Sequence, residues 1–214
     1  MGVANIFSPK ASRIIRVLLT HPNHKWSVLG LSKEANVGYG HTYRTIKTLL
    51  KIGLCRRTET NKIIITNPSE LLTRWANYHD FTLLNELSAY YYSFRDINDL
   101  IDRLSYANKK GLKYALTLHA GASLVAPYVR PVNVHIYVER MKIGEFEHLL
   151  NLQLTELGGN VFLVVPYDEG VFYNIQNVRG VWVASNVQLY VDLYNYPARG
   201  REAAEYLRKR LIGF

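Results

Sequence analysis

The sequence predicts an α+β protein with two domains: a small helical domain that ends in a β-hairpin, followed by a larger α/β sandwich domain. Three observations support this fold class. The net charge is confined to the first third of the chain, three helical patterns and two β-prone runs fill that same third, and from residue 80 onward β-prone and helical segments alternate. At 214 residues the chain has room for one or two domains.

The basic residues are unevenly distributed along the chain. Residues 1–67 hold eleven Lys and Arg against two Glu, whereas residues 68–214 hold fifteen basic and fifteen acidic residues. All of the formal charge of +9 therefore belongs to the first third. This asymmetry is typical of a protein in which one domain binds a polyanion, although a solvated basic surface would give the same count.

The cysteine content and the N-terminus bear on the compartment. The single cysteine, Cys55, cannot form an internal disulfide or supply the thiolate pair that structural zinc prefers. It is either a small buried hydrophobe or, because two arginines follow it, a thiol of lowered pKa. No apolar run approaches the ~18 residues that cross a bilayer, and Lys10, Arg13 and Arg16 stand where a signal peptide would be apolar. The sequence thus predicts a cytoplasmic protein with no membrane partner.

Two helices are predicted at the start of the chain. The first spans residues 9–20, because Ser8 and Pro9 suit the beginning of a helix and a His-Pro pair follows its last residue. The second is short and spans residues 28–35, with Ser27 as its N-cap.

A third helix is predicted over residues 41–52, after a turn over residues 36–40 that contains two glycines. The expected apolar face of this helix consists of Tyr43, Ile46, Leu49 and Leu50. Its other face is basic and consists of His41, Arg44, Lys47 and Lys51.

Two short β-prone runs, residues 54–58 and 62–66, predict a hairpin directly after the third helix. Three helices followed by a hairpin is the order of a winged helix-turn-helix, and this segment resembles the winged-helix transcription regulators. The resemblance implies that residues 39–51 form the recognition element, which enters the major groove of DNA, and that the hairpin, or wing, approaches the backbone or the minor groove.

The predicted DNA contacts fall into two groups. Base edges are reached from the first turns of a recognition helix by hydrogen-bonding side chains, which here are Tyr39, His41, Thr42 and Arg44. Arg44 is expected to read a base directly, because its guanidinium can donate two hydrogen bonds to guanine. The expected phosphate contacts are Lys47, Lys51, Arg56, Arg57 and Lys62. Winged helices also bind proteins, so an adaptor function stays open.

Residues 68–79 are predicted to form a linker helix with a one-sided stripe of Leu71, Leu72 and Trp75. Such a stripe either packs on its own domain or serves as a dimer contact. The C-terminal domain is then expected to span residues 80–214.

The C-terminal domain has the pattern of an α/β or α+β sandwich. Strands are predicted over residues 89–94, 114–118, 132–138, 161–165, 171–175 and 181–183. Helices are predicted over residues 96–108, 119–126, 144–157, 185–195 and 199–211.

One motif in this domain bears on catalysis. The letters HAGAS at residues 119–123 lie between the predicted strands YALTL and VNVHIYV, a layout that resembles the nucleotidyltransferase fold. In that fold a Gly-Ser turn precedes a strand with two alternate carboxylates that hold magnesium. The matching positions here carry Asn133 and His135, and the first acid is Glu139. The resemblance therefore implies a degenerate nucleotidyltransferase-like fold, with no catalytic residue, no metal and no cofactor.

The most specific string is NVQLYVDLYNYPARGREAAEYLRKRL at residues 186–211, which by itself predicts a helical hairpin. Together with LTLHAGASLVAPY and the winged helix, it resembles the AbiEi-type antitoxins of type IV toxin-antitoxin systems over nearly the whole chain. The family has a motif in its C-terminal region, and this chain matches it around Gln188, Asp192, Arg199, Gly200 and Glu202.

The resemblance implies a function and its partners. The N-terminal domain would bind inverted repeats in the double-stranded DNA upstream of a two-gene operon, and the C-terminal domain would support repression and the antitoxin role. The cognate toxin would be a nucleotidyltransferase, which need not contact the antitoxin directly.

The sequence thus predicts a non-enzymatic, sequence-specific DNA-binding transcriptional repressor that acts as an antitoxin, either as a homodimer or as paired monomers on repeated half-sites. The alternative is an enzyme in which a winged helix carries a divergent nucleotidyltransferase-like domain that modifies RNA or protein. The missing carboxylate pair argues against the enzyme.

Overall fold

The computed structural model describes residues 5–93, 97–156 and 158–214. The chain divides into two compact units, which we call unit 1 (Met1–Tyr78 with Phe214) and unit 2 (His79–Gly213). The architecture is mixed α and β, as the sequence predicts. No helix in the described part of the chain is long and apolar enough to cross a bilayer.

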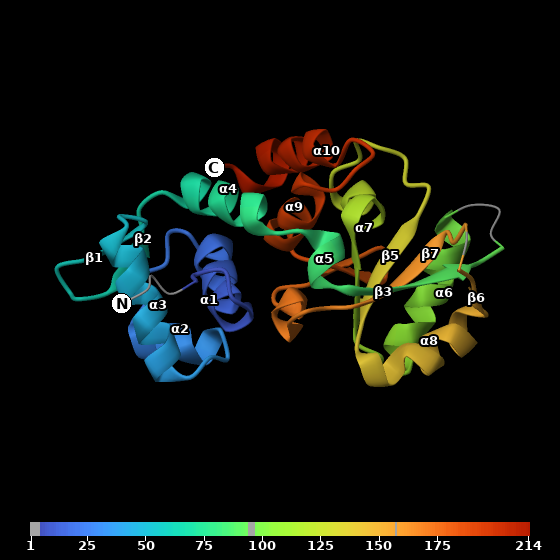
Figure 1. The fold of residues 1–214 in the computed structure, drawn as a ribbon, viewed down its shortest axis with the longest axis horizontal. Helices are drawn as coiled ribbons and strands as arrows, with labels where there is room; N and C mark the ends of the chain where they lie inside the picture. The colour runs from blue at the N-terminus through green and yellow to red at the C-terminus, as the bar shows by residue number, and fades with distance from the viewer. Residues whose placement is uncertain (1–4, 94–96, 157) are drawn as a thin grey trace. The chain divides into compact units, whose positions relative to one another are not determined.

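Unit 1 contains three helices that pack on one another (Figure 1). They are α1 (Pro9–Thr20), α2 (Val28–Glu34) and α3 (Tyr39–Lys51). The bounds of α1 match the prediction, with Pro9 in its first turn and Ser8 as N-cap. Ser27 caps α2 by accepting a hydrogen bond from the backbone N–H of Gly30.

The turn between α2 and α3 is shorter than predicted. Helix α3 begins at Tyr39 and includes Gly40, whereas the sequence predicts a start at residue 41. The turn needs one left-handed residue, and Asn36 fills that position with φ of 50°. Both glycines of the turn are therefore free to join the helix, Gly38 as its N-cap.

A two-stranded antiparallel hairpin follows α3, as predicted. It pairs β1 (Cys55–Arg57) with β2 (Ile63–Ile65), and Ile63 also pairs with Trp26 from the segment before α2. Helix α4 (Pro68–Tyr78) ends unit 1. Its apolar stripe of Leu71, Leu72 and Trp75 is buried, and the guanidinium of Arg16 in α1 lies 4.9 Å from the Trp75 ring centroid. The stripe thus packs on unit 1.

Unit 2 is built on one seven-stranded sheet (Figure 1). The strand order is β6-β3-β7-β5-β4-β9-β8, in which β5 runs parallel to β7 and β4 runs parallel to β9. The other neighbours are antiparallel. The strands are β3 (Glu86–Tyr91), β4 (Tyr114–Thr117), β5 (Val134–Val138), β6 (Gln153–Leu154), β7 (Val161–Val165), β8 (Gln176–Val178) and β9 (Val181–Val183).

Helices cover both faces of this sheet. Helices α7, α9 and α10 contact one another on one side, and α6 and α8 contact each other on the other side (Figure 1). Each central strand is therefore buried on both faces, and every residue of β4 and β5 is buried. The helices are α5 (Phe81–Leu84), α6 (Ile97–Lys109), α7 (Leu118–Val125), α8 (Ile143–Leu150), α9 (Asn186–Tyr194) and α10 (Gly200–Leu207), with short turns η1 (Arg140–Lys142), η2 (Glu169–Phe172) and η3 (Arg208–Ile212).

The structure corrects two predicted elements of unit 2. The segment predicted as a strand over 171–175 instead begins inside the 3-10 turn η2, where the Asp168 carboxylate accepts from the backbone N–H of Gly170 at 2.7 Å. The helix predicted over 144–157 ends at Leu150, because Asn151 adopts a left-handed conformation (φ 53°) that closes it. Residue 94 of the strand predicted over 89–94, residue 96 of the helix predicted over 96–108 and residue 157 of the helix predicted over 144–157 lie outside the described residues.

Candidate functional site

The outward face of α3 carries tyrosine and basic side chains. The inward face consists of Thr42, Thr45, Ile46 and Leu49, which are buried. The exposed residues recur three or four positions apart, so they lie on one side of the helix. Apart from Gly40, which has no side chain, they are Tyr39, Tyr43, Arg44, Lys47 and Lys51.

The burial of Thr42 contradicts its prediction as a base contact. Its hydroxyl lies within 3.4 Å of the carbonyl oxygens of Val37 and Gly38, to which it can donate. The Thr45 hydroxyl donates in the same way to the carbonyl oxygen of His41 at 3.1 Å. A threonine that bonds to the preceding turn has no need of water, so both side chains can face the core. Thr42 is therefore not exposed to contact a base.

Tyr43, rather than Thr42, is exposed on the outward face of α3. It was predicted for the apolar face, but its side chain is 44% exposed and lies beside Tyr39, which is 54% exposed. The two rings are stacked, with centroids 6.5 Å apart and an angle of 17° between their planes. Two exposed aromatic rings in the first turns of α3 offer apolar contact surface and two hydroxyl groups to a partner.

His41 is half-buried at the edge of this face. Burial lowers the pKa of its imidazole, and the nearby cations of Arg44 and Lys10 lower the pKa further. The imidazole is therefore neutral at pH 7 and can donate one hydrogen bond and accept another. Lys10, in the first turn of α1, thus lies close enough to add positive charge beside α3.

The wing adds cations from a second element. Arg56, Arg57 and Lys62 are exposed on β1 and on the turn that joins β1 to β2. The Arg57 guanidinium donates to the side-chain oxygen of Asn61 at 2.7 Å, which fixes it on the wing. Cys55 is buried beside them, and burial raises the pKa of its thiol to about 12. Cys55 is therefore a small hydrophobe of the core and no reactive thiolate.

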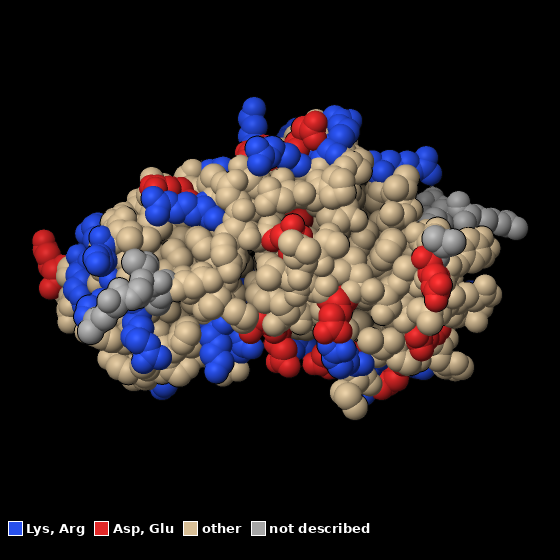
Figure 2. All heavy atoms as spheres, viewed as in Figure 1, with Lys and Arg blue, Asp and Glu red and all other residues tan. Residues whose placement is uncertain are grey.

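These side chains form one basic surface. Figure 2 shows Lys and Arg side chains gathered over α3 and the β1–β2 hairpin of unit 1. We call the exposed set the α3–wing surface: Tyr39, Tyr43, Arg44, Lys47, Lys51, Arg56, Arg57 and Lys62. A surface of this composition can attract a polyanion by charge and contact it through hydrogen bonds and aromatic rings.

A second region of interest is the turn after β4 in unit 2. Leu118 is buried with φ of 50°, a left-handed conformation that is rare for leucine and turns the chain sharply into α7. Gly121 packs so closely that a Cβ atom would lie 2.7 Å from the carbonyl oxygen of Leu116. The Ser123 hydroxyl donates to the carbonyl oxygen of Ala120 at 2.8 Å, within its own helix.

His135 lies opposite this turn, paired with Thr117 across β4 and β5. Its ring stacks on Phe162 at 4.6 Å between centroids and contacts Phe81 and Tyr196 edge-on. Burial lowers the pKa of His135 to about 3, with a further contribution from His119. Aromatic side chains thus surround the position at which the nucleotidyltransferase layout would place a magnesium ligand.

Glu139 lies at the other end of the same strand. It follows Val138, which pairs with Tyr114 at the start of β4, whereas His135 pairs with the end of β4. Glu139 therefore cannot share a metal ion with residues of the 119–123 turn. In the described part of the chain, no three His, Cys, Asp or Glu side chains lie together as metal ligands would.

Asp192 is the centre of a buried hydrogen-bond network in unit 2. Its carboxylate accepts from the Thr117 hydroxyl at 2.6 Å and the Tyr137 hydroxyl at 3.0 Å. The Gln188 side-chain amide donates to it at 2.7 Å, and Nε2 of His79 lies 3.0 Å away. Asp192 is 1% exposed. Strands β4 and β5, helix α9 and the segment before α5 thereby meet at one carboxylate.

Two further residues of the C-terminal motif shape the turn between α9 and α10. Arg199 adopts a left-handed conformation (φ 67°), and its guanidinium donates to the Tyr128 hydroxyl at 2.9 Å. Gly200 leaves no room for a side chain, because a Cβ atom would collide with the carbonyl oxygen of Leu193. Glu202 is exposed. The predicted helical hairpin is present as α9 and α10.

Sequence reasoning missed His79, Thr117 and Tyr137, which complete the Asp192 network. Gln188 and Asp192 stood out only through the family motif, because nothing in their local pattern distinguishes them. The partners of Asp192 outside α9 lie 55 to 113 residues away along the chain.

The comparisons with known proteins agree with the resemblance of the sequence. A family model described as a transcriptional regulator, AbiEi antitoxin, type IV toxin-antitoxin system matches residues 49–213. The match begins near the end of α3 and covers the wing, α4 and unit 2. No curated protein and no solved structure matches the chain.

Proposed function

Since this chain belongs to the family of AbiEi antitoxins, the transcriptional regulators of type IV toxin-antitoxin systems, we propose that it represses transcription by binding specific DNA through unit 1. Family membership supports a regulatory rather than an enzymatic role. The DNA site proposed is a pair of inverted repeats upstream of its own operon, so that the protein regulates its own synthesis.

The α3–wing surface is the observation that carries this proposal. It combines tyrosines, arginines and lysines on adjacent elements of a unit whose formal charge is +9, with twelve Lys and Arg against three Glu over residues 1–78. A surface of this kind gains affinity for DNA mainly by releasing the counterions of the phosphates. Such a gain falls steeply as salt rises.

The residues of α3 divide into two roles by position. Tyr39, Tyr43 and Arg44 lie in the first two turns, where a recognition helix in the major groove meets base edges. Arg44 is proposed to donate two hydrogen bonds to a guanine, and the tyrosine rings to contact thymine methyl groups or bases. His41 is neutral and half-buried at the edge of the same face, and we propose that its imidazole forms a hydrogen bond with the DNA there.

The phosphate contacts are proposed for the later turns of α3 and for the wing. These cations are Lys47, Lys51, Arg56, Arg57 and Lys62. Five phosphate contacts correspond to a slope of about −4 to −5 in a plot of log affinity against log salt. Two copies of the protein, either as a homodimer or as paired monomers, would occupy the two half-sites of an inverted repeat.

The antitoxin role is proposed to follow from the same regulatory function. The partner gene would encode a nucleotidyltransferase toxin, and neutralisation need not require a stable complex of the two proteins. Unit 2, whose core contains the hydrogen-bond network of Asp192, would support this role.

The test is binding of the purified full chain to its own upstream DNA and to a scrambled duplex, measured at ~50 mM and ~200 mM salt. We expect preference for the native sequence and a loss of affinity of about 500-fold on either duplex between the two salt concentrations. The variant Lys109→Ala, which removes an exposed lysine of unit 2, is the control. It should bind both duplexes as the wild type does. Equal binding of both duplexes, or a flat salt response, would refute the proposal.

A further inference from the structure

A crevice opens in unit 2 at the carboxyl ends of the parallel strands β5 and β7. The chain leaves β5 through η1 and α8 and returns as β7 on one side of β5. It leaves β7 through η2 and continues to β8 and β9, which lie on the other side of β5 in the sheet. The connection that follows β5 and the connection that follows β7 thus lead to opposite sides of β5 from the ends of two neighbouring strands. In open sheets, ligands bind in the crevice that such divergence creates.

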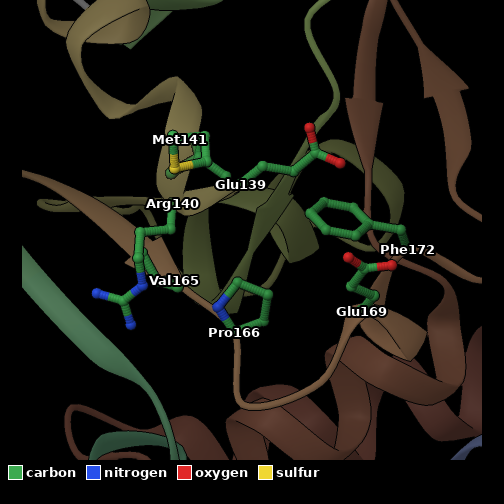
Figure 3. A pocket seen from close by; sticks show the side chains of 8 residues that line it. Glu139, Arg140, Met141, Val165, Pro166, Glu169 and Phe172 are labelled. Carbon is green, nitrogen blue, oxygen red and sulfur yellow. The ribbon is translucent and has the colours of Figure 1, made fainter.

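The walls of this crevice come from both connections. The volume is about 320 Å³, enough for a small ligand or for the side chain of a partner. Figure 3 shows Glu139 and Glu169 with their carboxylates near the Phe172 ring, and Met141, Val165 and Pro166 on the facing side. The crevice therefore combines an aromatic ring, an apolar wall and two carboxylates.

The charges around the crevice leave one carboxylate without a cation. Arg140 is paired with Glu86 through a hydrogen-bonded salt bridge, so it adds little net charge. The ammonium of Lys113 lies 3.7 Å from the Glu139 carboxylate, which it neutralises. Glu169 is exposed and makes no ion pair with any residue that the structure describes. The crevice thus keeps a net charge close to −1.

The position of Lys113 indicates which ligand chemistry fits. Its ammonium lies 4.5 Å from the centroid of the Phe172 ring as well as beside Glu139. The chain therefore already places one alkylammonium against an aromatic face and a carboxylate at this rim. Glu169 provides a second carboxylate near the Phe172 ring, on the side of the crevice (Figure 3).

We propose that this crevice binds a monovalent organic cation with an apolar body, in which an ammonium or guanidinium group pairs with Glu169 and the carbon chain lies against Phe172, Val165 and Pro166. Two sources share this chemistry: a free amine and the side chain of a lysine or arginine in a polypeptide. An anion is disfavoured by the net negative charge, and a neutral apolar ligand would leave the Glu169 charge without a partner.

Met141 provides a direct probe of occupancy. The chain contains two methionines, Met1 and Met141, and Met141 is 88% exposed at the mouth of the crevice. The full chain labelled with ¹³C in its methionine methyl groups therefore gives two methyl signals, and Met141→Leu identifies one of them. The probes are n-butylammonium and n-butylguanidinium, with n-butanol and butyrate as the neutral and anionic counterparts of the same chain length.

We expect a saturable shift of the Met141 signal with the two cations and a smaller one, or none, with n-butanol and butyrate. The variant Glu169→Gln keeps the shape of the side chain and removes its charge, so the dissociation constant for n-butylammonium should rise about two- to fivefold. Glu202→Gln, which removes an exposed charge on α10, should leave that constant unchanged. Raised salt should weaken binding to the wild type and have little effect on Glu169→Gln.

Two peptide probes distinguish the sources. One is a capped peptide with a single lysine among alanines, and the other has norleucine in place of that lysine. Tighter binding of the lysine peptide than of n-butylammonium assigns the crevice to a polypeptide, and the reverse order assigns it to a free amine.

Three results would overturn the proposal: a Met141 signal that no cation shifts, an equal shift with n-butanol, or an unchanged dissociation constant in Glu169→Gln. Circular dichroism of the Glu169→Gln chain, compared with that of the wild type before any ligand is added, reports whether the variant is folded. The test is independent of DNA binding, which is proposed for unit 1.

Discussion

At the scale of single residues, Asp192 illustrates how one buried carboxylate organises unit 2. Three neutral groups, Thr117, Tyr137 and Gln188, donate hydrogen bonds to it, and the His79 imidazole completes the set. A buried carboxylate is costly unless it is fully hydrogen-bonded, and here each of its oxygens has two neighbours. Asp192 therefore has a structural role in unit 2 of this chain.

The first prediction concerns the loss of that carboxylate. Asp192→Ala leaves several buried donors without an acceptor, so we expect the free energy of unfolding to fall by about 3 to 5 kcal/mol. Urea unfolding of the full chain, followed by circular dichroism, measures the change. Glu202→Ala removes an exposed motif residue and should cost no more than about 0.5 kcal/mol. Similar losses for both variants would contradict the structural role of Asp192.

The second prediction concerns His135. Burial lowers its pKa to about 3 in the folded chain, against an ordinary value of 6.5. Below pH 6.5 the unfolded chain therefore takes up a proton that the folded chain does not, so the free energy of unfolding decreases as pH falls from 6.5 toward 3. His135 alone contributes a slope of at most about 1.4 kcal/mol per pH unit.

The variant His135→Phe isolates this contribution, because phenylalanine can keep the stacking on Phe162 without titrating. Unfolding free energies of wild type and variant should differ in slope between pH 7 and pH 5, whatever their difference at pH 7. His148→Asn, which removes an exposed histidine of α8, is the control and should keep the wild-type slope. A His135→Phe slope equal to the wild-type slope would show that folding does not lower the pKa of His135.

At the scale of elements, α3 is proposed to contain two kinds of DNA contact, and this division can be tested. Arg44→Ala should weaken binding to the native upstream DNA by about 1 to 3 kcal/mol and leave the scrambled duplex nearly unaffected. Lys51→Ala should weaken both duplexes alike and reduce the salt slope by about 1. Competition binding on the two duplexes measures both effects. If the two variants lose affinity in the same pattern, the assignment of roles along α3 is wrong.

The helices of unit 1 show what local sequence determines. The bounds of α1 could be predicted because Ser8 and Pro9 mark one end and a proline lies just beyond the other. In α3, Ile46 and Leu49 are buried as predicted. The burial of Thr42 and Thr45 could not be predicted, because their hydroxyls lie within hydrogen-bond distance of backbone carbonyl oxygens and need no water. The prediction therefore placed Tyr43 in the core and Thr42 on the surface, whereas the structure shows the reverse.

The sheet and the network of unit 2 show what local sequence leaves open. β6 has two residues and is exposed, so it gives no periodic pattern to detect. Val171 and Phe172 of η2 are apolar and β-prone, yet Asp168 caps the segment and it forms a 3-10 turn. The partners of Asp192 are brought together by the topology of the whole sheet, which hydrophobic patterns of single segments do not encode.

At the scale of the molecule, the two units differ in charge. Unit 1 carries the formal charge of +9, and residues 79–213 hold fourteen basic and fourteen acidic residues. Several arginines of α10 and its flanks lie over tyrosine rings of the same unit, such as Arg199 over Tyr128 and Arg201 over Tyr194. These arginines already contribute to packing, so they are less available to phosphates than the cations of the α3–wing surface.

The last prediction follows from this division. The fragment of residues 1–78 contains its own core of α1, α3 and α4 and all five proposed phosphate contacts, so we expect it to fold and to bind DNA with the same salt slope as the full chain, about −4 to −5. Its affinity for an inverted repeat can be lower if unit 2 holds two copies together, but a change in pairing leaves the number of phosphates contacted per copy unchanged. The two slopes therefore separate pairing from direct contact. A full-chain slope steeper by two or more would mean that unit 2 also neutralises phosphates, and the neutral charge of unit 2 would then conceal a basic surface balanced by acids elsewhere.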